Sequence, residues 1–227
     1  MFFIITTLCE CPEAKATEQV DFEVQLIMAL IYISFITFMF YNFVEGLGEG
    51  CFHGSNIVFM ANGKHKRCDQ IVKGDVVLLG NNEPARVCCV AKILNTASNN
   101  INLLKFPCGL IVTEYHPIKI KDWWTFPKNI ATAVPFTDNF DAVYSFLLEK
   151  DDGSQIKSGL LIQGIECAPL GHNIQGNVIE HEFFGNFTAV RDALIAVNPE
   201  QYNNGLVEIT HMQRGPDEHV CGFVYNP

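Results

Sequence analysis

The chain is poor in charge, and poorest in positive charge. Charged residues make up 18% of its 227 residues and hydrophobic residues 48%. This balance excludes an intrinsically disordered chain, which has low hydrophobicity and high charge. There are 15 Lys and Arg against 25 Asp and Glu, so the net charge is −10, and the longest basic run is only Lys64–Arg67. We therefore expect no binding to nucleic acid through its phosphates.

Repeats and metal-binding spacings are also missing. The chain has no Gly-X-Y period and no heptad array, which excludes collagen and coiled coils. Its nine cysteines are an odd number, so at least one cannot sit in an intramolecular disulfide. No C-x-x-C or H-x-x-x-H spacing accompanies them. The cysteines are therefore expected to be mostly reduced thiols, and we predict no metal site and no cofactor.

One long apolar run lies near the start of the chain. Residues 24–44 contain no charged residue, and about 20 apolar residues span a bilayer core as a helix. The run predicts a hydrophobic, possible transmembrane helix and a single-pass membrane localisation; without it we expect a cytoplasmic protein. A buried core helix or an apolar β segment is the alternative, because Ile, Phe and Tyr also favour strands. The glycine-rich residues 46–50 are predicted to form a linker.

From residue 51 onward the pattern is that of an all-β protein. Turn residues separate short apolar or alternating runs at 56–60, 76–79, 85–94, 102–106, 110–113, 118–120, 142–149 and 159–165. Many short strands at close spacing predict a barrel or a folded-over sheet over residues 51–173. Residues 174–227 form a small mixed extension, expected to pack on that domain. It contains a predicted helix at 189–197, ended by Asn198-Pro199, and predicted strands at 205–210 and 220–225.

The first candidate for chemistry is Cys51, which directly follows Gly50. Its thiol can attack the carbonyl of the preceding peptide bond and convert the amide into a thioester. This shift is uphill, so the site needs a hydrogen-bond donor on the peptide and an acid for the leaving nitrogen. Thr113 and His116 lie three residues apart at the end of a predicted strand, and a tight turn would bring both into one pocket. Taken singly, a surface Thr-His pair and a buried cysteine are the simpler interpretations.

Six segments follow one another along the chain: Cys51-Phe52, 57–63, 71–77, 109–118 with its T-x-x-H pair, 143–149 and 159–167. Together they resemble a Hint domain, the self-processing fold of hedgehog C-terminal domains and inteins. The segments 180–185 and 170–173 are most similar to the Vint variant, which is associated with von Willebrand A domains. The resemblance covers about residues 51–185.

The resemblance implies protein autoprocessing at Gly50-Cys51. Cys51 is then the nucleophile, Thr113 holds the scissile peptide, and His116 protonates the leaving amide nitrogen. The substrate is the chain's own N-terminal segment, and the thioester passes to water or another small nucleophile. Cys167 is either a second thiol in a relay or a buried strand cysteine.

Departures from the family pattern restrict this activity. Hedgehog domains have an acidic residue near Lys128 or Asn129 that activates a sterol, so sterol transfer is not expected here. His172-Asn173 resembles the end of an intein, but Ile174 follows and cannot act as a nucleophile. Splicing is therefore not expected, and C-terminal cleavage at Asn173 is the residual possibility. Two alternative functions stay open: a degenerate Hint domain serving as a membrane-tethered binding module, and a trans-acting Cys/His hydrolase.

Overall fold

A computed structural model describes residues 28, 50–97, 100–176, 178–216 and 219–225. The predicted hydrophobic helix at 24–44, apart from Met28, and the linker up to residue 49 lie outside the described residues. Among the residues described, no helix is long and apolar enough to cross a membrane. The described residues from Gly50 onward belong to one compact unit, which contains the predicted β domain and its extension.

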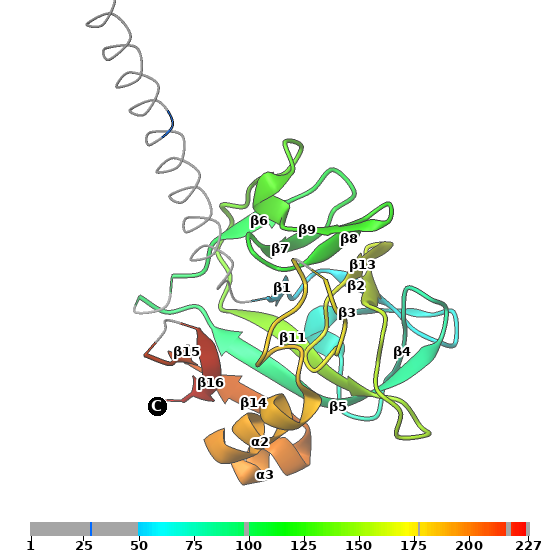
Figure 1. Cartoon of the computed structure of the whole chain (residues 1–227), viewed down its shortest axis with the longest axis vertical. Helices are drawn as coiled ribbons and strands as arrows, with labels where there is room; N and C mark the ends of the chain where they lie inside the picture. Colours follow the sequence, from blue (N-terminus) through cyan, green and yellow to red (C-terminus); the bar gives the residue numbers. More distant parts are fainter. Residues whose placement is uncertain (1–27, 29–49, 98–99, 177, 217–218, 226–227) are drawn as a thin grey trace, which may run out of the picture. The chain divides into compact units, whose positions relative to one another are not determined.

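The predicted β architecture is confirmed, and its centre is one large sheet (Figure 1). The long strands β5 (Pro84–Leu94) and β11 (Ala142–Glu149) pair antiparallel, and β4 (Val76–Leu78) pairs with β5. On the other side of β11 the order continues through β1 (Phe52–His53), β7 (Ile111–Thr113), β6 (Leu103–Lys105) and β10 (Val134–Pro135). The short β1 thus lies between β7 and β11, with Phe52 opposite Val112 and Tyr144.

A second sheet has the order β3-β2-β12-β13-β8-β9. Its strands are β2 (Ile57–Phe59), β3 (His65–Arg67), β8 (Ile118–Ile120), β9 (Trp123–Thr125), β12 (Leu160–Ile162) and β13 (Ile165–Cys167). Two 3-10 turns, Cys68–Gln70 and Pro127–Asn129, connect strands. The predicted strand at 159–165 is therefore wrong in its limits: β12 and β13 are the two arms of a hairpin. The hairpin turns at Gln163 and Gly164, which have φ angles of 52° and 76°.

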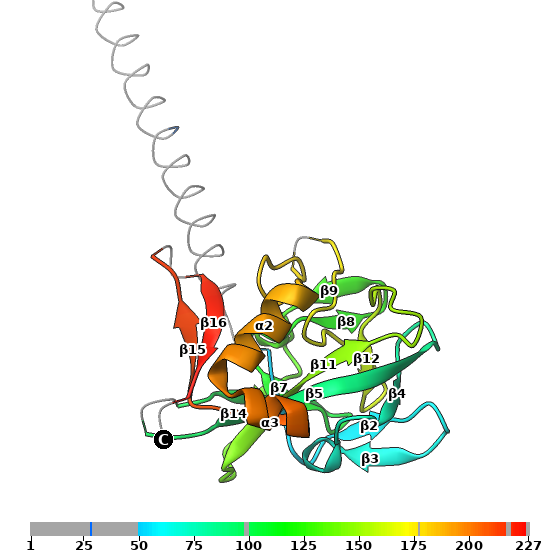
Figure 2. The same cartoon turned by 90° about the horizontal axis from the view of Figure 1, so that it is seen from below.

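The extension is tied to the large sheet. Strand β14 (Leu206–Ile209) pairs parallel with β5, and the hairpin β15 (His211–Arg214) and β16 (Val220–Val224) follows. Helix α2 (Phe187–Val197) packs against β11, β14 and β16, and the short α3 (Pro199–Asn204) packs on β14 (Figure 2). The helix predicted at 189–197 is confirmed, but Asn198-Pro199 also starts α3, because Asn198 caps it by accepting the Gln201 N–H at 3.0 Å.

Two clusters of buried side chains stabilise the unit, and the adjacent residues Cys51 and Phe52, at the start of β1, belong one to each. Phe52 belongs to the cluster between the two sheets, with Val112, Phe146 and Leu160. Cys51 belongs to the cluster under the extension, with residues of β5, β11, β14 and α2. Successive residues of an extended chain point to opposite faces, so the two neighbours are buried in different cores. The Gly50-Cys51 peptide consequently lies where the two cores meet.

Candidate functional site

The Gly50-Cys51 peptide is held by the end of β7. The backbone N–H of Cys51 donates to Thr113 Oγ1 at 3.0 Å, and the Thr113 N–H donates to the Cys51 carbonyl, also at 3.0 Å. Cys51 is 1% exposed and Thr113 5% exposed. A hydroxyl in contact with the amide N–H therefore fixes the orientation of this peptide in a buried setting.

The predicted tight turn between Thr113 and His116 is present. The His116 N–H donates to the Thr113 carbonyl at 3.1 Å, and the turn directs the His116 ring toward Gly50. A Cβ atom added to Gly50 would lie 3.0 Å from His116 Nδ1. The ring is also 4.2 Å from the Phe52 ring, centroid to centroid. Glycine at position 50 is therefore what lets the chain approach the imidazole so closely.

His116 is held neutral in this position. Burial lowers the pKa of His116 from 6.5 to about 3, although the nearby backbone of Ala168 and Gly50 favours the charged ring. Both ring nitrogens are buried and lack a hydrogen-bond partner. A buried, neutral imidazole without hydrogen bonds is able to accept a proton and to release it again. A group that transfers a proton at the Gly50-Cys51 peptide needs this ability.

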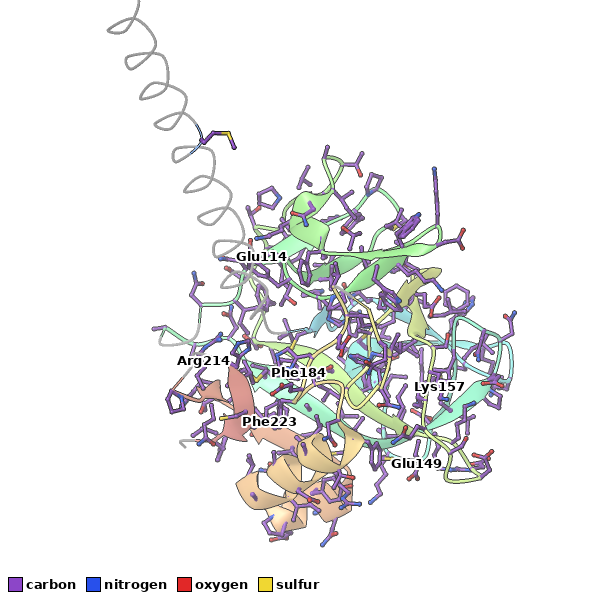
Figure 3. All side chains as sticks on the ribbon, viewed as in Figure 1. Glu114, Glu149, Lys157, Phe184, Arg214 and Phe223 are labelled. Carbon is purple, nitrogen blue, oxygen red and sulfur yellow. The ribbon has the colours of Figure 1, made fainter. Side chains whose placement is uncertain are left out.

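A small cavity of about 50 Å³, which we term the inner cavity, lies beside Gly50 and His116. Residues 168–170, 172, 178–181 and 184 form part of its wall, and β11 contributes Ser145. Phe184 forms part of its wall and packs against Phe223, with ring centroids 6.5 Å apart (Figure 3). The polar side chains that line it are those of His116, Ser145, His172, Glu180, His181 and Tyr115.

His172 and His181 are neutral members of this lining. Burial, and then the neighbouring His181, lowers the pKa of His172 to about 4. Burial, and then His219, lowers the pKa of His181 to about 4. His172 is 2% exposed, and its Nδ1 accepts the Ile174 N–H at 3.0 Å. The structure therefore brings His172 to the same cavity as Gly50 and His116.

Asn173 points elsewhere. It lines an outer cavity of about 500 Å³ together with Glu149, Gln155, Glu180 and Glu182. Its backbone has a φ of 48°, its N–H donates to the Gly185 carbonyl at 2.9 Å, and its side-chain amide donates to Gln155 Oε1. The side chain is thus held on Gln155, whereas C-terminal cleavage requires its nitrogen to attack its own carbonyl carbon.

Cys167 lies in the other core. It is fully buried in the cluster between the two sheets, and its Sγ contacts the Ile165 carbonyl at 3.5 Å. Burial raises the pKa of Cys167 well above its usual value, and Cys68 and Cys108 add to the effect. Cys51 belongs to the opposite cluster. The setting of Cys167 is that of a buried strand cysteine, and its role as a second thiol in a relay stays a prediction.

The comparison with family models decides the family. The Vint model, described as a Hint domain, matches residues 50–222, which is most of the chain. The chain belongs to the Vint family of Hint domains. The match begins at Gly50 and continues through the extension to β16. Hint domains generally process themselves in cis, acting on a flanking segment of their own chain.

Solved structures of inteins are similar to this Hint domain. A DnaB intein from Synechocystis is 15% identical with a TM-score of 0.38, and the match covers 52% of this chain and 97% of the intein. The MchDnaB-1 intein is 16% identical with a TM-score of 0.32, covering 49% and 92% respectively. No curated protein matches the chain.

Two residues of the site did not emerge from the sequence as candidates. They are Ser145, within the predicted strand run at 142–149, and His181, within the segment 180–185. A polar residue in an otherwise mostly apolar strand was the available signal for the first. For the second the signal was a histidine in a segment outside the T-x-x-H motif but within the resemblance. Within the described ranges, no group of three His, Cys, Asp or Glu side chains is arranged to hold a metal ion.

Proposed function

We propose that the domain cleaves its own chain between Gly50 and Cys51, once per molecule, through a thioester. One observation carries this proposal: the T-x-x-H turn contacts both sides of a single peptide bond. Thr113 Oγ1 accepts the N–H of Cys51, and His116 Nδ1 faces Gly50. A hydroxyl on the nitrogen and an imidazole against the acyl residue are the two groups that an amide-to-thioester shift requires.

In the first step the Cys51 thiol attacks the Gly50 carbonyl carbon. The thiol proton passes to the neutral imidazole of His116, and the new C–S bond forms as the carbonyl becomes an oxyanion. His116 then returns the proton to the Cys51 nitrogen, the C–N bond breaks, and Cys51 is left with a free amino group and a thioester. The low pKa of His116 makes it a ready donor once it is charged.

In the second step water or a small nucleophile attacks the thioester and releases residues 1–50. If the apolar run 24–44 spans a membrane, as the sequence predicts, cleavage frees the domain from it. The cleavage is unimolecular, so its rate does not depend on protein concentration. This independence separates it from a trans-acting hydrolase that uses the same residues.

The test follows the intact mass of the full chain, purified in detergent with an N-terminal tag. Native protein should yield a fragment comprising residues 51–227, and hydroxylamine, which traps thioesters, should accelerate its formation. Cys51→Ala should yield none. Cys88→Ala is the matched control, because Cys88 is buried in the same cluster but lies on β5. Native protein that stays uncleaved with and without hydroxylamine would refute the proposal and favour a binding-only domain.

A further inference from the structure

The inner cavity gathers polar atoms that the protein itself leaves unsatisfied. In the part of the chain that the structure describes, four buried side-chain polar atoms lack a hydrogen-bond partner: both ring nitrogens of His116, Ser145 Oγ and His181 Nε2. All three residues line the inner cavity, together with Gly50. Leaving a buried polar group unpaired costs about 1–3 kcal/mol. Their gathering around one cavity therefore indicates a polar ligand there.

The size of the cavity limits what that ligand is. A volume of about 50 Å³ accommodates one or a few water molecules. Water is also bound best where two to four polar partners converge, as they do here. The outer cavity is about ten times larger, and it shares Glu180 and His181 with the inner one. These two residues lie at the boundary of both cavities and mark the route from one to the other.

The hydrogen bonds of His181 define what it offers to the cavity. Its Nδ1 accepts two backbone N–H groups, those of Phe183 and Phe184, each at 3.1 Å. The neutral ring therefore carries its proton on Nε2, which is the unpartnered atom. His181 is thus a hydrogen-bond donor toward the cavity, whereas Ser145 Oγ is able both to donate and to accept. Together they match the oxygen and the hydrogens of one water molecule.

We propose that the inner cavity is the acceptor site of the reaction and that its ligand is the water that hydrolyses the Gly50 thioester. Ser145 and His181 are positioning residues for this water. The inference rests on the proposed function and deepens it, because it assigns hydrolysis as the fate of the thioester. The outer cavity has exposed carboxylates, which would attract a cationic acceptor. The inner cavity beside Gly50 is too small for an acceptor much larger than water.

Hydrolysis of the thioester redistributes the two protons of one water molecule. The water oxygen attacks the Gly50 carbonyl carbon, and one water proton passes to the amino group of Cys51 that the first step released. This amine has a usual pKa of about 7.7–8.0, so it is an adequate base near neutral pH. The C–S bond then breaks, and the thiolate of Cys51 takes the proton from the amine. The products are a Gly50 carboxylate, which loses the second proton to solvent, and a chain that begins with Cys51.

The test separates water attack from thioester formation in the full tagged chain. Two rates are measured by intact mass: hydrolysis in buffer alone, and cleavage with hydroxylamine, which traps the thioester. The first variant is Ser145→Ala. The second is His181→Asn, whose Oδ1 takes the place of Nδ1 and keeps an acceptor for the Phe183 and Phe184 N–H groups. Ser154→Ala and His211→Asn are the controls, since both residues are exposed and line no part of the inner cavity.

We expect both variants to lower the hydrolysis rate about tenfold or more, as the loss of a positioning hydrogen bond does. Hydroxylamine-trapped cleavage should stay within about twofold of the native rate, because its nucleophile is strong enough not to need positioning. A merely structural role would lower both rates together, and that result would overturn the inference. So would unchanged hydrolysis in both variants, or a released segment that carries the mass of an acceptor other than water. Absence of any cleavage or trapping in native protein would instead refute the proposed function itself.

Discussion

The buried histidines predict that the folded domain loses stability in mild acid. His116 and His172 are almost fully buried, with pKa values lowered by burial to about 3 and about 4. In the folded protein they stay neutral down to those values, whereas the unfolded chain binds protons below its usual pKa of about 6.5. The unfolded state therefore gains protons that the folded state does not, and stability falls as the pH falls from about 7 toward 4.

The size of the effect follows from these pKa values. Between about pH 7.5 and about pH 5.5, each buried histidine lowers the free energy of unfolding by about 1.3 kcal/mol. His181 is less buried and adds a smaller amount in the same direction. The total is about 3 kcal/mol, and with a urea slope of about 2 kcal/mol/M the midpoint should fall by more than about 1 M.

The assay is urea unfolding of the cleavage-inactive Cys51→Ala chain at the two pH values. His172→Asn in this background keeps an acceptor for the Ile174 N–H but removes one titrating group, so it should reduce the pH dependence by about 1.3 kcal/mol. His211→Asn, which alters an exposed histidine, should leave the dependence unchanged. A midpoint that is the same at both pH values would show that these imidazoles are not held neutral by burial, and the reasoning would fail.

Further substitutions test the geometry of the first step. Gly50→Ala should slow cleavage about 10–100-fold by displacing His116. Gly222→Ala, whose new Cβ meets the Gln213 side chain and no part of the site, should not slow cleavage, and timed intact mass measures both rates. Thr113→Val should slow cleavage at least about tenfold and Thr113→Ser much less, because only the hydroxyl is required. Cys167→Ala should cost about 1–3 kcal/mol of stability in urea yet leave the cleavage rate within about twofold, and a larger rate loss would favour the relay.

Much of the β framework was predictable because its signals are local. The runs at 85–94 and 142–149 became β5 and β11 with nearly the expected limits, since both are long and apolar. The β12–β13 hairpin was not predictable in the same way. Its turn needs positive φ at both Gln163 and Gly164, and glutamine gives no signal for that conformation. Strand β15 is mostly exposed and polar, and it forms because β16 pairs with it. Its own residues carry no local pattern that predicts a strand.

The candidate site was likewise predictable only where its signals are local. The pairing of Thr113 with His116 was predictable, because three-residue spacing at a strand end defines a tight turn. The meeting of that turn with Cys51 was implied by the resemblance and depends on β1 pairing with β7. The place of His181 was not predictable at all. It depends on a segment 65 residues beyond His116 folding back over the cavity, and this is a property of the tertiary structure.

The choice of a hydroxyl on the scissile nitrogen has a physical reason. A backbone carbonyl in that place would accept the amide N–H but would be fixed in direction by its own peptide plane. Thr113 Oγ1 accepts the Cys51 N–H in the precursor, and it is able to keep that N–H when the nitrogen becomes tetrahedral, which leaves the lone pair of the nitrogen to the proton from His116. The same contact then serves the nitrogen before and during the departure of Gly50. The pairing of β1 with β7 thus places the Thr113 side-chain oxygen against the nitrogen of the peptide bond that we propose to break.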